Sequence, residues 1–146
     1  MEIYEVDNRN DILIKRLVDI WESSVLKTHN FLSKDDFYKI KEYVPKYLKI
    51  VEHLIVAKED SIVGFIGINN KKIEMLFIDA AFIGKKIGEY LTNYVISNYN
   101  ANEVTVNEDN IKAVGFYEHL GFRTYKRTDF DEEGNPYPLL YMKLIK

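Results

Sequence analysis

The stretch that decides the fold is NEDNIKAVGFYEHLGF, residues 107–122. Asn110 has the short polar side chain that suits a helix N-cap, and Gly121 is the residue type that most often ends a helix. Phe116 falls on the apolar side of this helix. Tyr117 places a phenol next to that side, and a single tyrosine in such a position is more often structural than catalytic. The stretch predicts a short helix with one residue of chemical interest.

A second informative stretch lies upstream at residues 78–88, IDAAFIGKKIG. An apolar strand runs into a turn that contains Gly84 and Gly88, and a helix follows. The first turn of a helix presents unpaired N–H groups that bind phosphate, and glycine lets a ligand approach the backbone. Lys85 or Lys86 would add positive charge. An ordinary turn with solvated lysines explains the same residues equally well. The glycine spacing is not that of a Rossmann fold.

Hydrophobic periodicity places the remaining elements. We expect strands near residues 3–6, 54–57, 62–68, 73–78, 104–106, 122–128 and 139–144, and helices near 11–27, from 33 past 43, after 84 and over 110–120. Pro45 should kink or divide the second helix. The three central strands should form an antiparallel meander. The fold class is therefore α/β (α+β), a mixed and mostly antiparallel sheet flanked by helices, in one domain spanning residues 1–146.

Composition excludes several classes of protein. The chain has 146 residues, a net charge of −3, a pI near 5.7 and no cysteine. Disulfides, thiolate metal sites and a cysteine nucleophile are therefore excluded, and the three histidines lack metal-ligand spacing. We expect no metal and no nucleic-acid partner. The chain shows neither a signal peptide nor a membrane-spanning run, so a cytoplasmic location is expected.

The pattern Asn-x-x-Ala-x-x-Phe-Tyr-x-x-x-Gly-Phe, from Asn110 to Phe122, resembles the second cofactor motif of the GNAT acetyltransferase superfamily. The order of elements is similar to that fold over nearly the whole chain, and the glycine turn falls where the superfamily has its pyrophosphate loop. Residues 28–32 and 136–140 resemble a bacterial subgroup of small GNAT proteins. One departure concerns the loop, usually Arg/Gln-x-x-Gly-x-Gly/Ala. This chain has Ile83 in place of the Arg or Gln and Lys86 in place of the first Gly. A right-handed helical backbone would accept the Lys86 side chain.

The resemblance implies direct transfer of the acetyl group of acetyl-CoA to an amine. It implies that the N–H groups of Gly84, Lys85, Lys86, Ile87 and Gly88 hold the pyrophosphate. The backbone of Leu76, Phe77 and Ile78 would pair with the pantetheine arm where two strands splay apart, with Asn110 also in the cofactor site. Tyr117 would protonate the departing thiolate.

The acceptor side depends on loops. The expected base is His29, then Glu74, then Glu108, with a water chain as the alternative. Each has a structural alternative: His29 as a loop histidine, Glu74 as a solvent-facing strand residue and Glu108 as a partner of the helix start. Trp21, Phe31, Tyr137 and Asn107 are candidate walls of the acceptor pocket, although Trp21 also continues the apolar stripe of the first helix.

Two other functions compete with an enzyme. One is a GNAT-fold module that binds CoA or acyl-CoA without turnover. The altered glycine loop favours this alternative. The other is an interaction protein that has lost the ligand. The acceptor stays open between a small molecule and a peptide, and the acidic charge favours a cationic amine. A homodimer is compatible with the resemblance.

Overall fold

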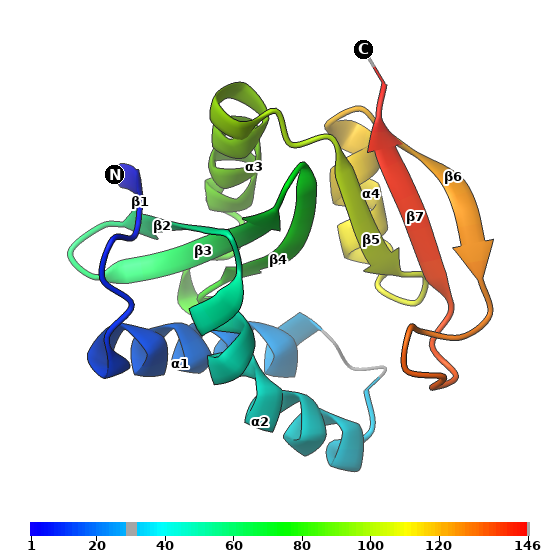
Figure 1. Ribbon diagram of the computed structural model, residues 1–146, viewed down its shortest axis with the longest axis horizontal. Helices are drawn as coiled ribbons and strands as arrows, with labels where there is room; N and C mark the ends of the chain where they lie inside the picture. The colour runs from blue at the N-terminus through cyan, green and yellow to red at the C-terminus, as the bar shows by residue number, and fades with distance from the viewer. Residues whose placement is uncertain (29–31, 146) are drawn as a thin grey trace.

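The computed structural model describes residues 1–28 and 32–145, and Figure 1 shows their arrangement. The strands are β1 (Glu2–Glu5), β2 (His53–Lys58), β3 (Ile62–Asn69), β4 (Lys72–Ile78), β5 (Glu103–Asn107), β6 (Phe122–Thr128) and β7 (Leu139–Leu144). The helices are α1 (Asp11–Thr28), α2 (Lys34–Ile50), α3 (Ile87–Tyr99) and α4 (Ile111–His119), with a single 3-10 turn η1 (Ala80–Phe82). This order confirms the one expected from periodicity.

The strands form one mixed sheet in the order β1-β2-β3-β4-β5-β7-β6. Within the described sheet only β4 and β5 pair in parallel, and every other neighbouring pair is antiparallel. The expected meander of β2, β3 and β4 is confirmed. Strand β7 lies between β5 and β6, so the last hairpin folds back into the sheet.

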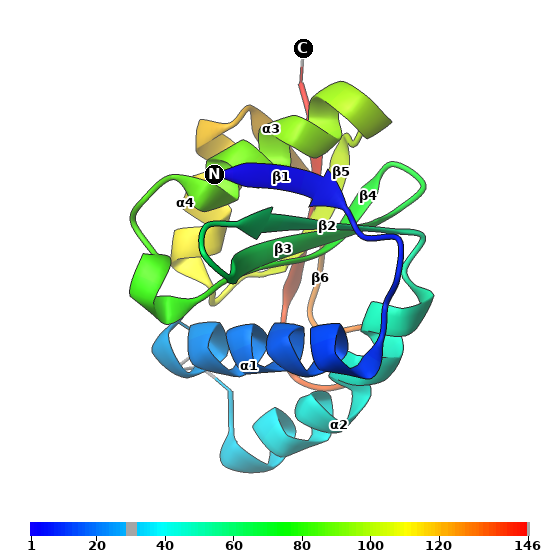
Figure 2. The same ribbon diagram turned by 90° about the vertical axis from the view of Figure 1, so that its left-hand side faces the viewer.

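Helices cover both faces of the sheet. Helices α1 and α2 lie on one side, and α3 and α4 lie on the other (Figures 1 and 2). Strand β3 is buried from Val63 to Ile68 because it packs against both layers. One core contains Leu17, Ile20 and Leu48 below the sheet, and the other contains Leu91 and Phe122 above it.

Helix α2 shows where packing overrides a local signal. Its first turn is capped as expected, because Ser33 Oγ accepts a hydrogen bond of 3.1 Å from the N–H of Asp36. The helix then runs without interruption through Pro45. Of the two effects expected of this proline, a kink or a division of the helix, the division does not occur. Proline removes one hydrogen bond, but Val44 and Leu48 beside it are buried. Burial of this face supports the helix in spite of the lost bond.

The feature that positions the site is the divergence of β4 from β5. They pair only at Lys72 with Glu103 and at Ile73 with Val104. Beyond that point β4 stays with β3, and β5 stays with β7. On β4, Ile73 pairs with Ile68 and Met75 pairs with Gly67, so Glu74 is the extra residue of a β-bulge. The described strands therefore leave one edge of β4 unpaired after Ile73.

Candidate active site

A narrow cleft occupies the gap between the diverging strands. Its volume is about 160 Å³, and α4 contributes to its wall. Leu76 and Phe77 line it from β4, and Asn110 and Tyr117 line it from the α4 segment. The Ile78 side chain instead lies against Gly64 of β3. Four of the residues expected around the cofactor therefore meet in one cleft, although they come from distant parts of the chain.

Tyr117 combines deep burial with access to this cleft. Only 5% of its surface is exposed, and its ring makes edge contacts with Phe116 and Phe122 at centroid distances of 5.0 and 5.5 Å. Burial raises the pKa of the Tyr117 phenol above its ordinary value of 10. The phenol is thus a proton donor that stays protonated at neutral pH.

The glycine turn leads into the start of α3. No side chain among the described residues caps this helix, and its first internal hydrogen bond runs from Tyr90 N to Lys86 O over 3.0 Å. The N–H groups of the preceding helical residues are therefore available to an anion. A Cβ added at Gly88 would lie 3.5 Å from Phe116 and 3.9 Å from Leu76. The helix start is consequently next to the cleft.

Two residues of the turn adopt left-handed backbone conformations. Gly84 has φ of 90°, which glycine accepts without strain. Lys86 has φ of 64° and ψ of 15°, so its backbone is not in the right-handed conformation that would accept a side chain without strain. The chain turns between η1 and α3, and Lys86 adopts there a conformation that glycine accepts more readily than lysine. A non-glycine residue pays roughly 1 kcal/mol or more for this conformation.

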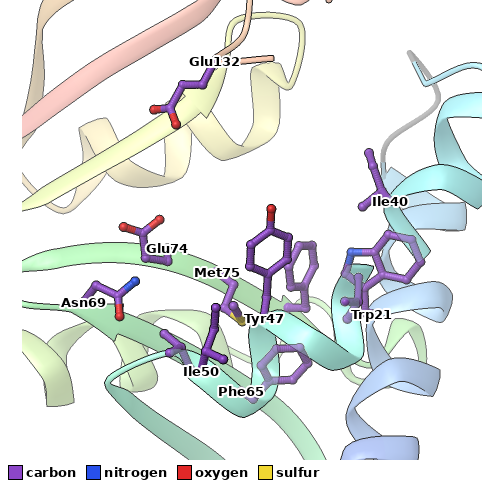
Figure 3. Close-up of a pocket in the computed structure, with 12 residues that line it drawn as sticks. Trp21, Ile40, Tyr47, Ile50, Phe65, Asn69, Glu74, Met75 and Glu132 are labelled. Carbon is purple, nitrogen blue, oxygen red and sulfur yellow. The ribbon is translucent and has the colours of Figure 1, made fainter. Parts of the chain in front are cut away.

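A second, larger cavity of about 390 Å³ adjoins the cleft (Figure 3). Its walls come from α1, α2, β3, β4 and the loop between β6 and β7. Trp21 stacks on Phe37 at a centroid distance of 5.3 Å and is 3% exposed. It therefore belongs to the core and to the cavity wall at once. Tyr47 lines the same cavity from α2, and Figure 3 shows its hydroxyl pointing into the open space.

Glu74 lies at the border between the cleft and the larger cavity. It lines both the cleft and the larger cavity, because the β-bulge turns this position toward the gap. Glu132 lines the larger cavity from the β6–β7 loop. Figure 3 shows the two carboxylates directed into the space between them. The larger cavity therefore offers negative charge beside an aromatic wall.

The other predicted acceptor residues lie elsewhere. Glu108 binds the guanidinium of Arg127, with Oε2 at 2.6 Å from Nε, and this hydrogen bond lowers the pKa of the Glu108 carboxyl. Asn107 lines the cofactor cleft rather than the larger cavity. The Tyr137 hydroxyl donates to Asp36 of α2 and lies in a separate groove. His29 and Phe31 lie outside the described residues, so their roles stay predictions.

Sequence reasoning missed most members of the larger cavity, among them Tyr47, Met75 and Glu132. Tyr47 continues the helical spacing of Ile40 and Tyr43 along α2, but that spacing does not distinguish a cavity wall from a core position. Met75 and Glu132 owe their positions to the bulge and to the hairpin loop. The signal for Glu132 was the concentration of acidic residues in residues 129–133.

Two other features, a metal site and a membrane span, are absent from the part of the chain that the structure describes. No group of three or more histidine, cysteine or carboxylate residues is arranged to hold a metal ion there. No helix within that part is long and apolar enough to cross a membrane.

Comparison with known proteins agrees with this geometry. Residues 26–144 match the acetyltransferase (GNAT) domain. The chain is 35% identical over 127 residues to the peptidyl-lysine N-acetyltransferase YjaB of Salmonella typhimurium, which covers 86% of this chain and 88% of that protein.

Solved structures show the same fold. The solution structure of apo-form YjaB from Escherichia coli has a TM-score of 0.87 and 32% identity, with 99% of each chain covered. An aminoglycoside 6'-N-acetyltransferase solved with coenzyme A has a TM-score of 0.64 and 19% identity, covering 100% of this chain and 98% of that one. These matches favour an enzyme over a binding module. The chain belongs to the GNAT acetyltransferase family and performs CoA-dependent acetyl transfer to an amine.

Proposed function

We propose that the acceptor is the ε-amino group of a lysine within a peptide or protein, and that it enters the larger cavity to meet the cleft at Glu74. The observation that carries the proposal is that junction: one carboxylate borders both cavities. The aromatic wall and the second carboxylate of Glu132 suit a lysine, which has an apolar stem and a cationic head. The names of the YjaB relatives, peptidyl-lysine N-acetyltransferases, support the same acceptor class.

The cleft and the glycine turn fit acetyl-CoA. The start of α3 offers the N–H groups of residues 84–88 to the pyrophosphate, and Lys85 and Lys86 add positive charge nearby. The unpaired edge of β4, from Leu76 to Ile78, offers backbone groups to the amides of the pantetheine arm. Acetyl-CoA supplies an acyl group already activated as a thioester. The residues of this chain bind it, exclude water and move protons.

Two side chains handle the protons in this proposal. Glu74 attracts the lysine ammonium and accepts its proton, directly or through one water molecule, so that the neutral amine can attack. Tyr117 gives its phenolic proton to the departing thiolate. Because the raised pKa keeps that phenol protonated, it is a donor throughout the neutral range. Two protons leave the nitrogen in all: the first goes to Glu74 before attack, and the second leaves as the tetrahedral intermediate collapses and restores the Tyr117 phenol, whose own proton has gone to the sulfur.

The direct test measures release of free CoA thiol with a lysine peptide, a free polyamine and an aminoglycoside as acceptors. The proposal expects the highest kcat/KM for the lysine peptide. Glu74→Gln should lower kcat/KM for that peptide about 100-fold, within the range for a general base, and leave the Kd for CoA unchanged. Glu59→Gln, in the exposed turn between β2 and β3, is the matched control. A higher kcat/KM for either non-peptide amine would overturn the lysine assignment.

A further inference from the structure

Next to the larger cavity, called the acceptor cavity from here on because the lysine is proposed to enter it, lies a groove that the reaction itself does not use. It has a volume of about 430 Å³ and lies between α2 and the loop that joins β6 to β7. Ile40 and Tyr47 line both this groove and the acceptor cavity. The two spaces are therefore neighbours that share a wall, and a chain leaving the acceptor cavity on this side would enter the groove.

The α2 side of the groove is an exposed aromatic surface. Tyr43 is 52% exposed and Tyr47 is 48% exposed, and their ring centroids are 6.4 Å apart. Large apolar side chains that form one contiguous exposed patch are typical of binding sites. Tyrosine rings also attract cations over their faces.

The opposite side carries negative charge in a fixed arrangement. Asp131 and Glu133 line the groove, while Glu132 between them lines the acceptor cavity. Asp131 Oδ1 accepts hydrogen bonds from the N–H groups of Glu133 and Asn135 at 3.0 and 2.8 Å. This turn holds the loop in shape, so three consecutive acidic residues are divided between two adjoining spaces.

A hydrogen bond joins the two sides of the groove. The Tyr137 hydroxyl donates a hydrogen bond to the Asp36 carboxylate. That bond lowers the pKa of Asp36, so the carboxylate stays charged at neutral pH. Three carboxylates, those of Asp36, Asp131 and Glu133, therefore surround a groove to which Lys39 contributes the one cation among its lining residues.

We propose that this groove binds a basic residue that flanks the acceptor lysine in the substrate chain. The occupant follows from charge complementarity and from continuity with the acceptor cavity. A lysine or arginine side chain has an apolar stem for the tyrosine rings and a cation for the carboxylates. The enzyme is thereby selective for lysines in basic surroundings, and the inference rests on the proposed lysine acceptor.

The experiment compares peptides that differ only around the acceptor lysine. Arginine, alanine or glutamate is placed in turn at each of the four positions on either side, and kcat/KM is measured. N-acetyl-lysine methylamide, which has no flanking residues, is the reference acceptor. Arginine at one or two positions should raise kcat/KM up to about fivefold over alanine, as expected for partly exposed ion pairs. The increase in kcat/KM should come mainly from a lower KM. It should disappear at about 0.5 M salt, where charges are strongly screened.

Two variants assign the effect to the groove. Glu133→Gln and Tyr43→Ala should each reduce the preference for arginine while leaving kcat/KM for the flank-free acceptor unchanged. Glu59→Gln should change neither. Equal rates for arginine, alanine and glutamate at every position would overturn the groove assignment while the lysine acceptor stands. Failure of every lysine acceptor, including the flank-free one, would instead overturn the proposed function and this inference together.

Discussion

Replacing Tyr117 by phenylalanine removes one oxygen atom from the cofactor cleft and leaves the ring. The edge contacts with Phe116 and Phe122 depend on the ring alone, so the substitution should preserve them. No hydrogen bond of the Tyr117 hydroxyl to another described residue is found in the structure. The free energy of unfolding should therefore change by less than about 1 kcal/mol. For a chain of this size that is a shift in Tm of roughly 4 °C at most.

Turnover should change far more than stability. A positioned general acid contributes about 100-fold or more to a rate, which corresponds to roughly 2.7 kcal/mol in the activation free energy. We expect kcat to fall by at least that factor. Binding of CoA should stay within about twofold of the unchanged protein, because the backbone groups proposed to hold it are untouched.

The assay is steady-state thiol release with a lysine peptide, together with calorimetry of CoA binding. Tyr125→Phe on the exposed strand β6 is the matched control and should leave both quantities unchanged. Burial raises the pKa of Tyr117 above 10, so the wild-type rate should not decline between pH 8 and pH 10 through loss of this proton. A kcat for Tyr117→Phe within twofold of wild type would refute the reasoning and remove the phenol from the mechanism.

Three further substitutions test other parts of the structure. Lys86→Gly should be more stable than Lys86→Ala by about 1 kcal/mol in urea unfolding, because only alanine keeps a Cβ in the left-handed conformation; equal stabilities would contradict the strain. Burial raises the pKa of Glu5, but hydrogen bonds from Tyr99 and His53 outweigh it and lower the net value below 4.5. The stability lost in Glu5→Gln should therefore be present at pH 5 and shrink as the pH falls below 4.5; an unfolding free-energy difference that grows in acid would reverse this sign. Asn110→Ala removes the cap that accepts from Ala113 N at 3.2 Å and should cost about 1 kcal/mol in unfolding free energy, whereas Asn110→Ser should retain most of it; a loss as large for serine would argue against capping.

Pro45 and Lys86 show where reasoning from local sequence fails. Proline disfavours the interior of a helix, yet α2 continues because Val44 and Leu48 are buried against the rest of the fold. Lysine disfavours a left-handed conformation, yet Lys86 adopts one because the chain must turn there. In both cases tertiary packing outweighs a local preference of a few kcal/mol or less.

The candidate site also contains residues that local sequence indicated and residues that only tertiary packing placed. Tyr117, Asn110, Leu76 and Phe77 lie in the cofactor cleft, and the stretch at residues 107–122 had already singled out the first two. Glu108 was expected near the acceptor, but the structure pairs it with Arg127 from β6. That pairing depends on the position of a hairpin that follows it in the chain.

The sequence by itself determined the order of helices and strands, the family resemblance and the helix start after the glycine turn. Each of these depends on residues within a few positions of one another, through periodicity, capping and glycine conformation. Only the tertiary structure decided that Trp21, Tyr47, Glu74 and Glu132 surround one cavity. Those four residues come from four separate segments, and their meeting depends on the β4 bulge, the divergence of β5 and the packing of α2, which no local pattern encodes.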